Sequence, residues 1–233
     1  HGCGPTAAGM VIGYWDGQGY GGLVPGDAST QTAAVNTMIA SGNSDLDLGT
    51  NYADYCHPED YYPNLVPDLS EPPIGDEHAD HCVADYMKTS QSYYGNYYGW
   101  SWFLRVGPAL QSYTRQASGG GYYGITEDLY VSWDGSLNWD SLRAEIDAGR
   151  PMVFLVDTDG DGSTDHFVTV IGYAETGGVQ YYGCLNTWDS NIHWYEFAPL
   201  AQGQPWGVFG GTTYRIVALD QHLYLPLIEA TVG

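Results

Sequence analysis

The sequence predicts an α+β fold over residues 1–233, with an N-terminal helix that bears Cys3 packed on a C-terminal antiparallel sheet. Two observations predict it. A run of small and apolar residues follows Cys3 without a strand-like alternation, and from residue 152 onward short β-branched and aromatic runs alternate with turns. Helices that precede a series of strands are typical of the α+β class.

The first predicted element is a helix that begins at Cys3. Pro5 suits a first helical turn, where its missing N–H would have no partner, and the small and apolar residues after it predict a buried helix. A thiol at the positive end of a helix dipole has a lowered pKa, which makes Cys3 a candidate catalytic nucleophile. The alternative is an ordinary buried or disulfide-bonded cysteine.

Further helices are predicted over residues 30–40, capped at Ser29 or Thr30, and over residues 76–89, 107–116 and 136–149. Prolines and Asn/Asp residues predict loop over 41–75. Together, residues 41–125 are interpreted as a loop-rich, aromatic-rich insertion or subdomain. Its aromatic stretch at 93–102 suits a carbohydrate or peptide groove, and packing within a glycine-rich subdomain explains it equally well.

Strands are predicted at residues 152–156, 167–173, 179–185 and 192–197, with one more inside 207–219. His166 stands at the start of the second strand, a rigid place for an imidazole that accepts the proton of a thiol. Asn186 follows the third strand, and an amide followed by the indole of Trp188 can hold and shield an imidazole. Asn186 is therefore the expected orienting residue, with Asp189 as the second candidate.

These residues resemble those of papain-like cysteine peptidases, and within that clan the bacteriocin-leader (double-glycine) peptidase-like group. The motifs are Cys3-Gly4-Pro5-Thr6-Ala7-Ala8, the strand that begins at His166, and Asn186-Thr187-Trp188. The resemblance implies a papain-like fold, a Cys3–His166–Asn186 triad and a peptide or protein substrate. Most members carry an oxyanion-hole glutamine a few residues before the cysteine, whereas this chain starts at His1. An inactive calcium-binding or adhesion module and an amidase or acyltransferase are the alternatives.

A second motif runs from Asp157 to Asp165, directly before His166. Aspartates stand at positions one, three, five and nine, with glycine at six, as in the first part of an EF-hand loop. The twelfth position is Val168, so the loop is not a complete EF-hand. We expect it to bind Ca²⁺ and to fix His166, while a solvated acidic turn is the alternative. The expected ligands are Asp157, Asp159, Asp161, Ser163 and Asp165.

Composition restricts the setting. The net charge is −22, with 6 Lys and Arg against 28 Asp and Glu, which disfavours nucleic acid and anionic membranes as partners. No run of about 20 apolar residues is present that would span a bilayer. The composition and the lack of an initial methionine predict a secreted protein whose signal segment is absent from this chain. Among the four cysteines, Cys56 and Cys82 are the expected disulfide, which leaves Cys184 free.

Overall fold

The computed structural model describes residues 2–30, 32–40, 82–90 and 99–219. Its helices and strands follow one another in the order α1 (Cys3–Gly17), α2 (Ala33–Ile39), α4 (Val83–Tyr86), the 3₁₀ turn η3 (Phe103–Arg105), α5 (Val106–Ala117), β1 (Tyr122–Tyr130), α6 (Trp139–Asp147), β2 (Met152–Asp157), β3 (His166–Thr176), β4 (Val179–Leu185), β5 (Ile192–Glu196) and β6 (Gly207–Ala218). The predicted loop at 41–75, residues 76–81 of one predicted helix, most of the aromatic stretch and Cys56 lie outside the described residues.

The six strands form one sheet in the order β1-β6-β2-β3-β4-β5, and every neighbouring pair is antiparallel. The predicted α+β class is confirmed, with the cysteine-bearing helix α1 at the N-terminal end and the sheet after it. One strand, β1, was not predicted. Its sequence mixes acidic, glycine and aromatic residues, and it is an edge strand that pairs with β6 alone. Two of its nine residues, Tyr123 and Glu127, are exposed and five are half-buried.

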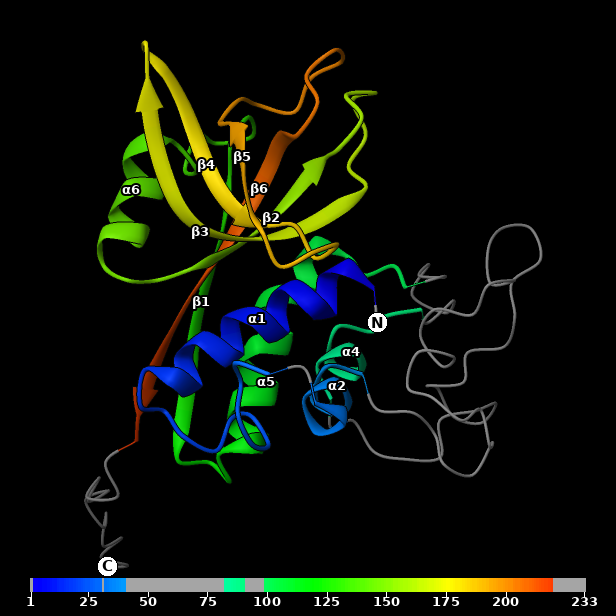
Figure 1. Cartoon of the computed structure of the whole chain (residues 1–233), viewed down its shortest axis with the longest axis vertical. Helices are drawn as coiled ribbons and strands as arrows, with labels where there is room; N and C mark the ends of the chain where they lie inside the picture. Colours follow the sequence, from blue (N-terminus) through cyan, green and yellow to red (C-terminus); the bar gives the residue numbers. More distant parts are fainter. Residues whose placement is uncertain (1, 31, 41–81, 91–98, 220–233) are drawn as a thin grey trace, which may run out of the picture.

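Both faces of the sheet are covered (Figure 1). All six residues of β2 are buried, because Val153 and Leu155 pack with α1, α2, α4 and α5, while Phe154 and Val156 pack on the other face beneath Leu142 of α6. This alternation is the period-two pattern of a strand with a hydrophobic layer on each side. Helix α5 lies inside the range interpreted as an insertion, and its buried residues belong to the same core as those of α1.

Several predicted boundaries shift because capping side chains set them. Thr32, rather than Ser29 or Thr30, caps α2 by accepting a hydrogen bond from the Val35 amide at 3.3 Å, while Ser29 binds Asp27. Asn138 caps α6 by accepting from two first-turn amides, so that helix begins at Trp139 and not at residue 136. Helix α4 ends at Tyr86, before the positive φ angles of Lys88 and Ser90.

Strand β6 is thin where two aromatic rings approach it from opposite faces. A Cβ atom at Gly211 would lie 2.6 Å from the ring of Phe154, and one at Gly210 would lie 2.7 Å from the carbonyl oxygen of Leu129 and 3.2 Å from the ring of Phe103. Real Cβ atoms do not approach other atoms so closely, so these two positions require glycine. Phe103 can therefore sit deep against the sheet, with 5 % of its surface exposed.

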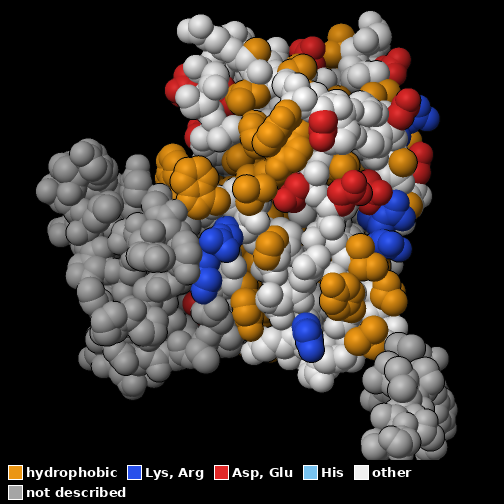
Figure 2. Space-filling view, turned by 180° about the vertical axis from the view of Figure 1, so that it is seen from behind, with side chains coloured by type: hydrophobic (Ala, Val, Ile, Leu, Met, Phe, Trp, Pro, Cys, Tyr) orange, Lys and Arg blue, Asp and Glu red, His pale blue; other side chains and the backbone are white. Residues whose placement is uncertain are grey.

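The surface reflects the composition. Figure 2 shows patches of hydrophobic side chains beside acidic ones, with few basic side chains between them. Within the described residues, no helix is both long and apolar enough to cross a membrane.

Candidate active site

Cys3 stands at the start of α1 and lines a cavity of about 780 Å³. His166, Thr187 and Trp188 line the same cavity, so the sheet supplies one wall and the start of the helix the other. The two elements come together because α1 is apolar over most of its length and packs directly on β3. The sequence-predicted nucleophile and base therefore share one cavity, although 163 positions separate Cys3 from His166.

Burial dominates the chemistry of the Cys3 thiol. Desolvation raises its pKa, and the amide N–H groups of Phe167, Gly4 and Cys3 itself lower it without offsetting the burial. The prediction that the helix start would lower this pKa is therefore wrong in its net direction. The N–H groups of the first turn do favour the thiolate, as a helix dipole requires, but the protein atoms packed around the sulfur outweigh them.

His166 is the first residue of β3 and is buried, with 5 % of its surface exposed. Its Nε2 atom lies 2.7 Å from the backbone oxygen of Asn186 and 3.3 Å from the hydroxyl of Thr187. The indole of Trp188 lies over the imidazole with the ring centroids 4.3 Å apart, as a shielding residue should. Desolvation lowers the pKa of His166, while the Asn186 carbonyl and the charge of Asp165 act in the opposite sense.

The two predicted orienting side chains do not face His166. Asn186 contacts the imidazole through its main-chain carbonyl, and its side-chain oxygen instead accepts from the amide of Trp188 at 3.1 Å. The carboxylate of Asp189 lies 2.9 Å from Nε2 of His193, and this contact lowers the pKa of Asp189. Both side chains stabilise the turn after β4. The turn places the backbone carbonyl oxygen of Asn186 against the His166 ring.

Within the described part of the chain, no hydrogen bond joins the Cys3 thiol to His166. What ties their elements together is Thr169 of β3, whose hydroxyl donates to the carbonyl of Ala7 in α1 at 2.9 Å. Thr169 and Ala7 are both buried. The spacing between nucleophile and base is therefore set by the packing of α1 on β3 and by this bond.

Two residues of the site were not predicted from the sequence. Thr187 has a φ of 68°, a conformation that a β-branched residue rarely adopts, and this turn aims the Asn186 carbonyl at the imidazole. Trp206 also has a positive φ, of 63°; its indole stacks on Tyr195 at 3.7 Å and meets His166 edge-on at 6.3 Å. Their sequence context, an Asn-Thr-Trp and a Pro-Trp-Gly turn, carries no specific signal of either role.

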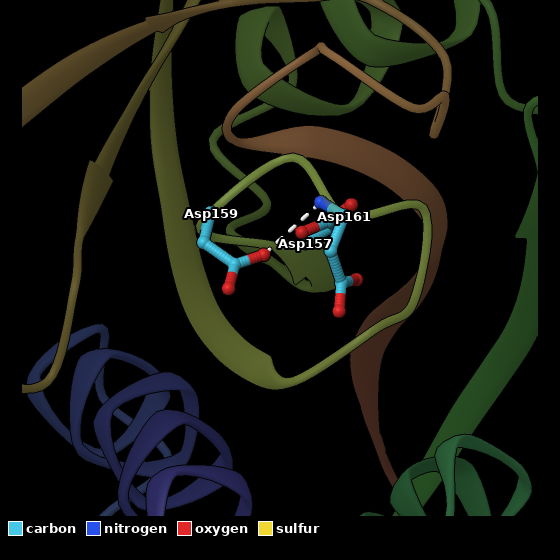
Figure 3. Close-up of side chains that lie close together, drawn as sticks. All are labelled: Asp157, Asp159 and Asp161. Carbon is cyan, nitrogen blue, oxygen red and sulfur yellow. Dashed lines mark hydrogen bonds between the residues drawn. The ribbon is translucent and has the colours of Figure 1, made fainter.

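The acidic loop between β2 and β3 brings three of the five predicted metal ligands together (Figure 3). One carboxylate oxygen from each of Asp157, Asp159 and Asp161 lies within 4.8 Å of the others. Gly162, at the sixth position, has a φ of +89° and makes the sharp turn that this spacing needs. Asp165 is not part of this cluster.

Two carboxylates of the loop, Asp157 and Asp165, accept hydrogen bonds from main-chain amides and from a threonine. The buried carboxylate of Asp157 accepts from Gly160 and Gly162 at 2.8 and 2.7 Å; desolvation acts to raise its pKa, but these amides outweigh it and the pKa is lowered. Asp165 accepts from the amide and hydroxyl of Thr158 at 2.9 and 2.5 Å. The backbone carbonyl of Asp157 in this loop also accepts a hydrogen bond from the Trp206 amide at 2.6 Å. Trp206 therefore contacts both the acidic loop, through this hydrogen bond, and the ring of His166.

Two comparisons with known proteins bear on the site. Residues 1–214 match the model of the Peptidase C39-like family, in agreement with the resemblance carried by the Cys3, His166 and Asn186 motifs. A search of curated proteins gives no match. The family match covers α1, the acidic loop, the turn after β4 and most of β6, and therefore every residue of the site described above.

Proposed function

The chain belongs to the Peptidase C39-like family, a family of cysteine peptidases, and we propose that it hydrolyses peptide bonds with Cys3 as nucleophile and His166 as general base. One observation carries this proposal. Cys3, at the first turn of α1, and a buried histidine held at 2.7 Å by a carbonyl oxygen line the same cavity. That arrangement supplies a nucleophile, a proton acceptor and an orienting group, as thiol-dependent acyl transfer requires.

The Asn186 carbonyl selects the tautomer of His166. A carbonyl oxygen can only accept a hydrogen bond, so in the neutral ring Nε2 carries the hydrogen and Nδ1 has the free lone pair. Nδ1 is therefore the base that takes the thiol proton. In this chain the third member of the triad acts through its main chain, while the Asn186 side chain supports the turn.

The reaction then proceeds by acyl transfer. The Cys3 sulfur attacks the substrate carbonyl carbon as its proton passes to Nδ1 of His166, and the backbone N–H of Cys3 at the start of α1 donates to the oxyanion that forms. His166 then gives its proton to the leaving nitrogen as the C–N bond breaks. Water, deprotonated by His166, attacks the thioester and releases the acid and the thiol. The raised pKa of Cys3 and the lowered pKa of His166 both favour an uncharged pair before substrate binds.

The test compares two histidines that contact the turn after β4, His166 through Asn186 and His193 through Asp189. Cys3→Ala and His166→Ala are expected to abolish cleavage of a quenched fluorescent peptide library. His193→Ala is expected to retain it, because His193 is partly exposed and binds Asp189 rather than His166. Cleavage by Cys3→Ala protein with an unchanged fold, judged by circular dichroism, would overturn the assignment.

A non-catalytic extracellular calcium-binding or adhesion module is the alternative, and the missing hydrogen bond between Cys3 and His166 in the described residues favours it. An amidase or acyltransferase would use the same residues. Alkylation by iodoacetamide separates active from inert protein. A catalytic Cys3 reacts faster in the wild type than in His166→Ala, whereas an inert thiol reacts slowly and equally in both.

We also propose that Ca²⁺ binds the acidic loop through Asp157, Asp159 and Asp161, and that the protein works outside the cell, where the ion is abundant. The converging carboxylates and the Gly162 turn support this proposal. Bound Ca²⁺ would relieve the repulsion among the carboxylates and hold the start of β3. Excess EGTA is then expected to lower the Tm and the peptidase activity together, and Asp159→Asn should weaken both responses to Ca²⁺. An unchanged Tm and full activity in EGTA would refute it.

A further inference from the structure

One side of the active-site cavity is built almost entirely from aromatic rings. Phe103, Tyr130 and Phe209 pack edge-to-face in a triangle, with centroids 5.6 to 5.7 Å apart, and Trp133 meets Tyr130 at 5.1 Å. We call these four residues the aromatic wall. All four line the cavity that also contains Cys3 and His166. The wall comes from η3, β1, β6 and the segment after β1, so it is a product of the tertiary fold.

The aromatic wall is rigid at its base and open at its rim. Phe103 is buried, whereas 78 % of Trp133 is exposed. Trp102 and Leu104, which flank Phe103 and also line the cavity, are 54 % and 64 % exposed. Exposed apolar side chains that converge on one hollow mark a place where apolar surface is covered by a ligand. A fixed floor with a large exposed indole at its edge is suited to hold a flat apolar group.

The polar and charged side chains that line the cavity indicate which class of ligand it can bind. Among the described lining residues there is no lysine or arginine, and the single carboxylate, Asp165, is already bound by Thr158. Apart from His166, the Cys3 thiol and the indole N–H groups, the other polar side chains of the described lining are hydroxyls. A sugar-binding site combines rings with planar polar side chains that bind sugar hydroxyls, and that set is missing from the described lining. An acidic group would also meet the net charge of −22.

We propose that the aromatic wall is a substrate subsite that accepts a large apolar side chain, aromatic above all, from a peptide whose scissile bond lies at Cys3. The inference rests on the proposed peptidase function, because the wall and the nucleophile share one cavity. The cavity also meets a second hollow at Thr6, Thr187 and Trp188, so an extended peptide can enter on one side of Cys3 and leave on the other. The preferred substrates are uncharged or basic peptides with an aromatic residue at a fixed place near the cleaved bond.

The test maps cleavage sites in a mixed peptide library by mass spectrometry. Wild-type protein is expected to enrich Phe, Tyr, Trp and Leu about 10- to 100-fold over Gly and Asp at one position near the cleaved bond, the effect of burying a large apolar side chain. Trp133→Ala should reduce this preference about tenfold while cleavage of Gly-containing peptides persists. Tyr123→Ala is the matched control, because this exposed tyrosine of β1 lies outside the cavity.

A second measurement tests the aromatic subsite separately from the peptidase function. Cys3→Ala protein is titrated with an aromatic peptide, its glycine analogue and a chitin oligosaccharide, followed by calorimetry, with and without Trp133→Ala. Tighter binding of the aromatic peptide that depends on Trp133 supports the subsite even if no peptide is cleaved, which would overturn the peptidase function alone. Cleavage without an aromatic preference, or Trp133-dependent binding of the oligosaccharide instead of the peptide, overturns the subsite.

Discussion

Thr169→Val tests whether the bond between helix and strand sets the catalytic geometry. Thr169 lies three residues after His166 on β3, and its hydroxyl donates to the carbonyl of Ala7, four residues after Cys3 in α1, at 2.9 Å. With 2 % of its surface exposed, Thr169 has little water to take the place of that bond. Valine keeps the shape of the side chain and removes the hydroxyl. Thr169→Ser does the opposite, because it keeps the hydroxyl and removes the methyl group.

The expected losses of stability are similar for the two variants. Removing a buried hydrogen bond costs about 1 kcal/mol of unfolding free energy, and the Ala7 carbonyl keeps its helical partner, which holds the cost near that figure. Removing one buried methyl group also costs about 1 kcal/mol. The valine and serine variants should therefore be equally stable, but only the serine variant keeps the hydrogen bond to the Ala7 carbonyl. Because small displacements of reacting groups are costly, kcat/KM should fall about tenfold in the valine variant and change little in the serine variant.

Urea unfolding followed by tryptophan fluorescence gives the two free energies, and initial rates on a fluorogenic peptide give kcat/KM. Equal loss of activity in both variants would show that packing alone positions α1 on β3. A valine variant as stable and as active as the wild type would show that the Thr169 hydroxyl contributes nothing, and would refute the reasoning.

Three further predictions concern the ionisable groups of the site. Burial raises the pKa of Cys3, so the thiolate absorbance of wild type minus Cys3→Ala should appear only above the ordinary thiol value of 9.0, and a thiolate at neutral pH would contradict an uncharged pair. Burial lowers the pKa of His166 in the folded protein, so as the pH falls through 6.5 the unfolded chain binds a proton before the folded chain does. The free energy of unfolding of the wild type should therefore fall below that pH, and that of His166→Gln should fall less. Equal losses of the two proteins in urea unfolding would argue against a desolvated imidazole. Asp189→Asn should keep kcat/KM within about fivefold of wild type, because its carboxylate faces His193, and a much larger loss would restore Asp189 as an orienting residue.

The sequence predicts the regular elements where local pattern and tertiary environment agree. Strands β2, β3 and β4 are β-branched or aromatic and buried in the sheet, so their predicted ranges lie close to the observed ones. Strand β1 was not predicted because acidic and glycine residues, which are depleted in strands, interrupt its aromatic and β-branched residues. Two helices start three residues later than predicted, because Thr32 and Asn138 are their capping residues.

The structure brings the predicted Cys3 and His166 to one cavity, but the contacts expected of Asn186 and Asp189 differ from those observed. Cys3 and His166 could be found because a helix start and a strand start are visible in the sequence. The use of the Asn186 carbonyl instead of its side chain depends on the positive φ of Thr187, and the contact between Asp189 and His193 depends on the pairing of β4 with β5. The direction of the Cys3 pKa shift depends on burial by residues distant in sequence. None of these follows from local pattern.

Gly210 influences the shape of the proposed aromatic subsite from a position outside the cavity lining. It lies in β6, outside the cavity lining, yet a Cβ atom there would lie 3.2 Å from the ring of Phe103 and 2.7 Å from the Leu129 carbonyl. Any larger residue must move the floor of the aromatic wall or the strand beside it. The depth of the cavity thus depends on a residue inside the sheet, and a substitution there would change the proposed subsite without replacing Cys3 or His166.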